Sequence, residues 1–358
     1  MKIVVRYQDG TVEDSEGNVL SFGLDRFVSD ICLGEHCFMC GASPTNTSFN
    51  DEHIIPKWVL RKLDLYKDKI TLPNKAQIPY ERYVVPCCTS CNTFLGETVE
   101  SEIKCAFDSG HDSLNKYISQ NGTQKLFLWL ALIFFKTHLK DSFLRKHLDM
   151  RKGVETIGND YDWSFMHHVH CLIRTLKTGI EFDERCLGSM IVLPATVSSN
   201  YSQFDFCDTY ASNTIMLRIG DVAIVSVLDD SCASAYFLAP ILEKITGPCS
   251  PLQLREILAH VTLINDKLKY RPRFFTKFDR VKQSLSIHTE LPETMDMEPF
   301  TKEEFGQVLY SKVYDHLGKI TCPNGEFTEK NLKAGNYRFL RLCCVIRFKN
   351  RATPFRVF

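Results

Sequence analysis

The sequence predicts an α+β protein: a small N-terminal domain organised by a metal, a helical segment, and a mixed α/β C-terminal region. Residues 31–100 are rich in cysteine, proline and asparagine, which is typical of a domain too small to fold on its own core. Residues 123–138 and 161–177 have the apolar spacing of helices, and residues 188–230 have the pattern of strands. We expect domains at residues 1–110 (core 31–107), 111–185 and 186–358, the last a candidate substrate-, partner- or signal-recognition region.

The overall composition is that of an ordinary globular protein. The 358 residues carry 43 basic and 43 acidic side chains, and this balance neither supports nor excludes a nucleic-acid partner. The N-terminus has no apolar stretch of the kind found in a signal peptide, so we expect a cytoplasmic protein whose fifteen cysteines are reduced. The longest apolar run, residues 126–135, is too short to cross a membrane and predicts a buried core helix.

The remaining elements follow from periodicity and turn residues. Residues 89–107 place their apolar side chains on one helical face, and a Gly220-Asp221 turn predicts a hairpin within residues 214–228. The patterns at 252–268 and 302–317 predict two more helices.

Two Cys-x-x-Cys pairs carry the first functional signal. Cys37 and Cys40 form one pair and Cys88 and Cys91 the other, with 47 residues between the pairs. Two such pairs complete a closed tetrahedral thiolate site, which suits one structural zinc ion per chain. Cys87 lies outside the two-residue spacing and continues an apolar strand, so we expect it in the core.

Between the pairs lies the segment Asp51-Glu52-His53-Ile54-Ile55-Pro56, and Asn92 follows the second pair directly. This order resembles the HNH (ββα-metal) endonuclease family, in particular its four-cysteine-zinc branch, which includes phage endonuclease VII and bacterial restriction and defence nucleases. The resemblance covers about 65 residues, less than a fifth of the chain. It implies a β-hairpin that carries the acid and the histidine, and a helix that carries the asparagine.

The resemblance also implies the chemistry of the site. The catalytic residues would be His53, Glu52 and Asn92. A neutral imidazole can take a proton from the attacking water, which is the role expected for His53. Glu52 and Asn92 would supply oxygen ligands to a catalytic Mg²⁺ or Mn²⁺ ion.

This chain departs from the family pattern at several positions. Glu52 replaces the commoner aspartate, and Asn92 replaces the last histidine of the family, as in the endonuclease VII branch. The middle asparagine has no certain counterpart, although Asn74 is a candidate. Glu100 lies on the same predicted helix as Asn92. The interpretation that we favour for it is a solvated carboxylate, and the alternatives are a further metal ligand or a partner of the ligands.

Basic residues supply candidates for nucleic-acid binding. Lys57, Arg61 and Lys62 follow Pro56 on a predicted helix next to the catalytic segment. Residues 267–282 hold seven basic residues among aromatic ones and include Arg271, Arg273 and Lys277. The alternative for this stretch is a strand with core aromatics and solvated charges. His167 and His170 share a helix face without acidic neighbours, which favours a polar helix face over a metal site.

We therefore expect a nuclease that acts on nucleic acid, foremost double-stranded DNA, in antiphage defence or restriction. RNA remains an alternative substrate, because such a site recognises a phosphate. A non-catalytic zinc module that binds nucleic acid or protein is the alternative from another class. A homodimer or a partner protein stays open, and no membrane association is expected.

Overall fold

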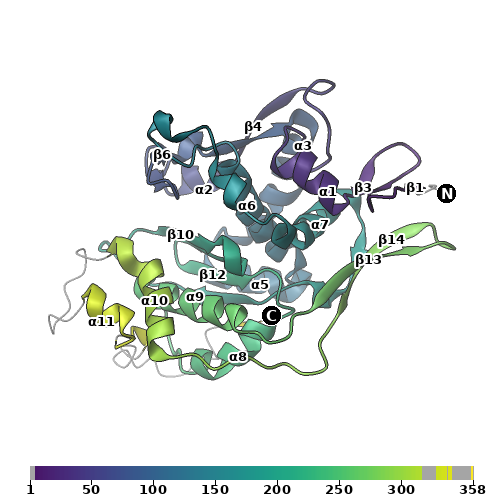
Figure 1. Cartoon of the computed structure of the whole chain (residues 1–358). Helices are drawn as coiled ribbons and strands as arrows, with labels where there is room; N and C mark the ends of the chain where they lie inside the picture. The colour runs from purple at the N-terminus through teal and green to yellow at the C-terminus, as the bar shows by residue number, and fades with distance from the viewer. Residues whose placement is uncertain (1–4, 317–327, 337, 341–355, 358) are drawn as a thin grey trace. The chain divides into compact units, whose positions relative to one another are not determined.

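The computed structural model describes residues 5–316, 328–336, 338–340 and 356–357. The protein is mixed α and β, with helices and several small sheets (Figure 1). Its chain forms two compact units, and none of the described helices is long and apolar enough to cross a membrane. Unit 1 comprises Met1–Asp108, Asn121–Glu184 and Phe274–His288, and unit 2 comprises Ser109–Gln120, Arg185–Arg273 and Thr289–Phe358.

The sheets of unit 1 are small. Strands β1 (Val5–Arg6), β2 (Val12–Glu13) and β3 (Val19–Ser21) form one antiparallel sheet. Strands β4 (Phe49–His53) and β7 (Val84–Cys88) form an antiparallel pair, and β5 (Lys69–Thr71) and β6 (Gln77–Pro79) form another between them in sequence. Strands β13 (Arg273–Asp279), β14 (Ser284–Glu290) and β8 (Glu181–Phe182) make a fourth sheet.

The helices of unit 1 include the one predicted over residues 89–107. It is built from α3 (Thr89–Phe94), a π-helical turn (Leu95–Glu100) and α4 (Ser101–Ala106). The others are α1 (Leu24–Arg26) with a π-helical extension (Phe27–Cys32), α2 (Lys57–Lys62), α6 (Gln124–Asp141) and α7 (Ser164–Thr178).

Helix α6 is the core of unit 1, and the prediction of a buried helix there is confirmed. Fifteen of its 18 residues are buried, because the helix is apolar on almost every side. It packs against α7 and against β7. The helical segment predicted as a separate domain, residues 111–185, is therefore divided: its larger part shares a core with the cysteine-rich hairpin, and residues 109–120 belong to unit 2.

Unit 2 is built on an antiparallel sheet with the strand order β10-β11-β12-β9-β15. The strands are β9 (Met190–Pro194), β10 (Phe204–Thr209), β11 (Thr214–Ile219), β12 (Val222–Val227) and β15 (Arg356–Val357). The predicted hairpin turn is confirmed: Ile219 pairs with Val222, and Gly220 has a φ of 63°, which favours glycine.

Helices complete unit 2. α8 (Ala233–Leu242) and α9 (Pro251–Asp266) share an apolar cluster with the sheet, and α10 (Lys302–Val313) packs on α9 and on α11 (Glu329–Lys333). Helix α5 (His111–Asn121) begins beside the β11–β12 turn, where the His111 amide donates to Asp221. The helices predicted at 252–268 and 302–317 correspond to α9 and α10.

Candidate metal centre and the polar site beside it

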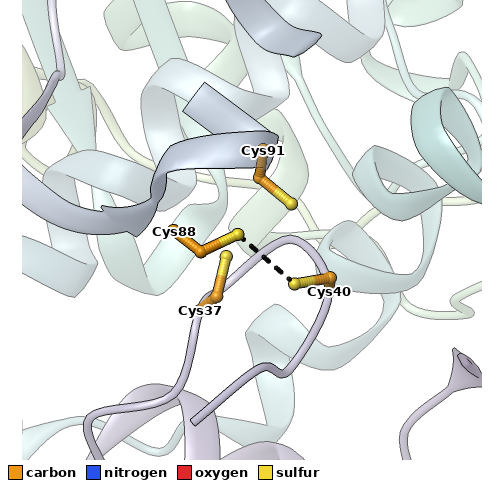
Figure 2. Close-up of side chains that lie close together, drawn as sticks. All are labelled: Cys37, Cys40, Cys88 and Cys91. Carbon is orange, nitrogen blue, oxygen red and sulfur yellow. Dashed lines mark hydrogen bonds between the residues drawn. The ribbon is translucent and has the colours of Figure 1, made fainter. Parts of the chain in front are cut away.

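The four predicted cysteine ligands come together (Figure 2). The sulfur atoms of Cys37, Cys40, Cys88 and Cys91 all lie within 4.8 Å of one another. Cys37 and Cys40 belong to the loop before β4, Cys88 ends β7, and Cys91 lies on α3. The loop closes at Gly41, whose amide donates to the Cys37 carbonyl at 2.7 Å and whose φ of 79° favours glycine.

The spacing of the sulfur atoms suits a zinc ion. A Zn–S bond of about 2.3 Å in a tetrahedral site places the sulfur atoms about 3.8 Å apart. The Cys40 and Cys88 sulfurs are 3.6 Å apart. The four-cysteine cluster can therefore hold a metal such as zinc.

The thiol pKa values show why such a cluster needs a cation. Hydrogen bonds from Cys40, and then from Cys87 and Cys91, lower the pKa of Cys37. The same contacts work against the next ionisation: the hydrogen bond with Cys37 raises the pKa of Cys40 to about 12 and also raises that of Cys91. A bound metal removes this opposition, because it stabilises all four thiolates together.

Cys87 is buried, as predicted for a core residue. Its sulfur nevertheless lies 3.8 Å from that of Cys37, and this contact raises the pKa of the Cys87 thiol. Cys87 is outside the group of four that meets the ligand distances. It supports the cluster without completing it.

Helix α7 supports the cluster with basic side chains that sequence reasoning missed. Lys177 Nζ donates to the Cys91 sulfur at 3.0 Å, and His170 Nε2 donates to the Phe38 carbonyl, inside the first Cys-x-x-Cys loop, at 2.8 Å. Arg174 is fully buried, and burial lowers the pKa of its guanidinium to about 10, against the charges of Cys171 and Cys40, which raise it. The helix face predicted to be polar is buried at His170, because this face packs on the cysteine loop. The signal was available, since residues 170, 174 and 177 have helical spacing.

The predicted catalytic segment lies on β4, which pairs antiparallel with β7 through a long connection that contains α2, β5 and β6. In the β4–β7 pair, Glu52 is opposite Val85 and His53 is opposite Val84, and α3 begins directly after β7. Because side chains alternate along a strand, Glu52 points to the interior and is 6% exposed, whereas Asp51 is exposed. Glu52 and His53 thus leave the strand on different sides.

A buried lysine binds Glu52. Lys136 Nζ of α6 lies 2.6 Å from Glu52 Oε1 and also donates to the His53 carbonyl at 2.6 Å. The Lys136 side chain is 1% exposed and that of Glu52 is 8% exposed. The ammonium group therefore neutralises Glu52 and fixes the backbone of His53 at the same point.

His53 is half-buried and has the properties of a neutral base. Burial lowers the pKa of its imidazole, and the charge of Lys57 lowers it further. Its Nδ1 atom is buried without a hydrogen-bond partner in the described part of the chain. A neutral ring of this kind can accept a proton at neutral pH.

Asn92 joins the helix to the strand. Its Nδ2 atom donates to Asn50 Oδ1 at 2.8 Å and to the Asp51 carbonyl at 3.1 Å. Asn74, the candidate for the middle asparagine, is in the turn between β5 and β6 and donates to the Arg145 carbonyl at 2.7 Å. That bond gives Asn74 a role in holding the turn.

Glu100 is a correction to the sequence analysis, which favoured a solvated carboxylate. It ends the π-helical turn, is half-buried, and has a pKa raised to about 7 by burial and by Glu52, against the charges of Lys136 and Lys57. Among the described residues, however, the four cysteines are the one cluster of histidine, cysteine and acidic side chains at metal-ligand distances. Glu52, His53 and Glu100 do not form a second cluster at such distances.

The predicted nucleic-acid-binding residues differ in their surroundings. Lys57, Arg61 and Lys62 are exposed on α2, and Lys62 also donates to the Phe107 carbonyl. Arg271 pairs with Asp229 at 3.6 Å and Arg273 with Glu290 at 3.4 Å, so their charges are partly neutralised.

The alternative prediction for residues 267–282 is confirmed for the strand, β13, but not for core aromatics: Phe274 is only half-buried and Phe275 is exposed. Phe274 stacks on His168 with 3.5 Å between the ring centroids, and Lys277 is exposed. Strand alternation places Arg273, Phe275 and Lys277 on the exposed face and Phe274 on the other.

Comparison with protein-family models, with curated proteins and with solved structures finds no match to this chain. Function is therefore inferred from the cysteine cluster and from the polar residues of the hairpin and helix beside it.

Proposed function

We propose that the protein is a metal-dependent endonuclease of the HNH (ββα-metal) class that hydrolyses phosphodiester bonds, foremost in double-stranded DNA. One observation carries the proposal: Glu52 and His53 lie on a hairpin strand, Asn92 lies on the helix that follows the hairpin, and four cysteines join the two. A four-cysteine site is closed and structural, so it leaves the chemistry to these polar residues.

His53 would act as the general base. Hydrolysis requires removal of a proton from water, and the lowered pKa of His53 keeps its ring neutral and ready to accept one. Lys136 would hold the ring in place by binding the His53 carbonyl. Asn92 would keep α3 against β4 through its bonds to Asn50 and Asp51.

Carboxylate and amide oxygens, as in Glu52, Asn92 and Glu100, are ligands that a hard divalent cation prefers. Mg²⁺ or Mn²⁺, when bound, would stabilise charge on the phosphate and on the leaving oxygen. Glu52 and Asn92 would hold the ion, with Glu100 as a further carboxylate. Lys136 binds Oε1 of Glu52, so Glu52 Oε2 is the oxygen left for the ion.

The substrate would be positioned by the exposed basic face of α2. Lys57, Arg61 and Lys62 all lie on this short helix, which begins four residues after His53. Contacts of this kind bind the phosphate backbone and give affinity without sequence choice. Cleavage of invading DNA, in restriction or antiphage defence, is the biological role we propose.

A non-catalytic zinc module is the second candidate, and the Lys136–Glu52 pair favours it. A carboxylate that is already neutralised by a buried ammonium has less need of a metal. In that case the hairpin and helix would serve only to present α2 and its neighbours to a nucleic acid or a protein.

One assay separates the two candidates. Purified zinc-loaded protein is incubated with supercoiled plasmid and, separately, with RNA of matched sequence, with Mg²⁺, with Mn²⁺ and with EDTA. We expect nicked or linear plasmid with a divalent ion and none in EDTA. If neither nucleic acid is cut under any metal while the plasmid is still bound, the binding-module candidate replaces the nuclease.

A further inference from the structure

An open cavity of about 480 Å³ in unit 1 contains a cysteine that neither the metal centre nor the proposed reaction uses. The cavity is lined by residues from β3 and the loop after it, from α7 and from β13. Its lining includes Ser21, Phe22, His167, His168, Cys171 and Phe274. Cys171 is partly exposed and lines this cavity.

The surroundings of Cys171 are those of a thiol with a base. His167 lies one helical turn earlier on α7, and its Nε2 atom is 3.8 Å from the Cys171 sulfur. The same nitrogen donates to the Phe22 carbonyl at 2.8 Å, which fixes the ring beside the sulfur. The hydroxyl oxygen of Ser21, on β3, lies 4.0 Å from the Cys171 sulfur.

The charges around the pair favour the thiolate. Burial alone would raise the pKa of the Cys171 thiol, but His167, Ser21 and Arg174 outweigh burial and lower it. Burial likewise works against a charge on His167, but the sulfur raises the pKa of that ring to about 9. A thiolate beside an imidazolium is the arrangement that makes a cysteine reactive.

We propose that Cys171 and His167 form a nucleophilic thiol site that small electrophiles such as peroxides modify from the cavity. The thiolate attacks one oxygen of the peroxide, an S–O bond forms as the O–O bond breaks, and hydroxide leaves. The product at Cys171 is a sulfenic acid, and the peroxide is the oxidant that is consumed. This site is separate from the four-cysteine cluster and does not depend on the proposed nuclease activity.

The other thiols of unit 1 supply internal comparisons. Cys105 is exposed on α4, so it is open to reagent. Cys32 is buried, and burial raises the pKa of its thiol. If exposure alone controlled reactivity, Cys105 would react fastest. If the pair with His167 controls it, Cys171 would react first.

The test labels zinc-loaded full-length protein with iodoacetamide at pH 6.5 and follows each cysteine by peptide mass spectrometry. The sulfur displaces iodide, so the rate measures thiolate reactivity directly. We expect Cys171 to react at least about tenfold faster than Cys105, because the pair with His167 favours the thiolate of Cys171. A second aliquot treated with hydrogen peroxide and dimedone should carry the sulfenic-acid adduct at Cys171.

Two variants assign the effect to the pair. His167→Asn should slow labelling of Cys171 about tenfold or more at pH 6.5 and leave Cys105 unchanged. Phe275→Leu, which changes a residue of β13 that lines the same cavity, should leave both rates unchanged. The pH profile of the wild type keeps the test decisive if His167→Asn fails to fold: the Cys171 rate should stay nearly level from pH 6.5 to 8. A rate that rises tenfold per pH unit, as for an ordinary thiol, would overturn the proposal.

Discussion

Lys136 Nζ lies 2.6 Å from Glu52 Oε1, and the two residues are separated by 84 positions in the chain. Both side chains are almost fully buried. The pair therefore ties the central helix of unit 1 to the strand that carries His53. A buried pair of this kind is strongly destabilised when one partner is removed, because the other charge stays behind unpaired.

The first prediction concerns this pair. Lys136→Met leaves the Glu52 carboxylate buried without a partner and should lower the free energy of unfolding by about 3–5 kcal/mol. The double variant Lys136→Met, Glu52→Gln should recover part of that loss, because no buried charge remains. Urea denaturation of zinc-loaded protein measures both. A loss under about 1 kcal/mol in Lys136→Met would show that Glu52 is solvated and not dependent on Lys136.

The second prediction concerns the cluster of cysteines. Cys91→Ser should abolish tight zinc binding and unfold unit 1, because the metal joins α3 to the loop that holds Cys37 and Cys40. Elemental analysis of the wild type should give about one zinc per chain. Cys105→Ser is the matched control, since this exposed cysteine lies outside the cluster. Equal zinc content in both variants would contradict the assignment.

The third prediction concerns Lys177. A closed four-thiolate zinc site carries excess negative charge, which the ammonium 3.0 Å from the Cys91 sulfur reduces. Lys177→Met should therefore speed zinc loss to a chromogenic chelator several-fold, and Lys177→Arg should restore most of the retention. Lys146→Met, which removes a surface pair with Asp160, should not change the rate. Equal rates for Lys177→Met and wild type would remove Lys177 from the metal centre.

The fourth prediction is a pH dependence that arises from His170. Burial lowers its pKa well below 6.5 in the folded protein, so the unfolded chain binds the proton more readily. The contribution of His170 to the free energy of unfolding is therefore fully present above about pH 6.5. It is lost as the pH falls below that value, by at most about 1.4 kcal/mol per pH unit.

The measurement for His170 compares slopes. His170→Gln keeps a donor for the Phe38 carbonyl but cannot titrate, so its urea midpoint should fall less steeply between pH 6.5 and 5 than that of the wild type. Zinc release at low pH affects both proteins alike, and the difference between the slopes isolates His170. Parallel slopes would contradict the buried neutral histidine.

The cysteine cluster was predictable because its signal is local: each Cys-x-x-Cys pair brings two thiols together within one turn. Two such pairs in one small domain are typical of a four-thiolate metal site. The helix that begins at the second Cys-x-x-Cys pair was also predicted from local periodicity, and it corresponds to α3 and α4. Lys136 was not identified as a buried residue, because it follows the apolar run of residues 126–135 and is not part of it. Which carboxylate binds Lys136 depends on packing across 84 residues, and no local pattern specifies it.

The division of the chain into two units was also not predicted from the sequence. The apolar surface of α6 predicts that the helix is covered on all sides, but not which segments cover it. The environment of Glu100 has the same origin, because the π-helical turn before it changes the face on which the side chain lies. Both depend on tertiary packing.

The most direct test of the nuclease proposal is the single-turnover cleavage rate of His53→Ala on plasmid DNA with Mg²⁺ or Mn²⁺. The variant should cut about 10²–10⁴-fold more slowly than the wild type, because it lacks the base that activates water. Its zinc content, urea midpoint and DNA affinity should be unchanged, and His147→Ala, a histidine outside the site, should cut at the wild-type rate. Wild-type cleavage by a folded His53→Ala variant would contradict the proposed chemistry.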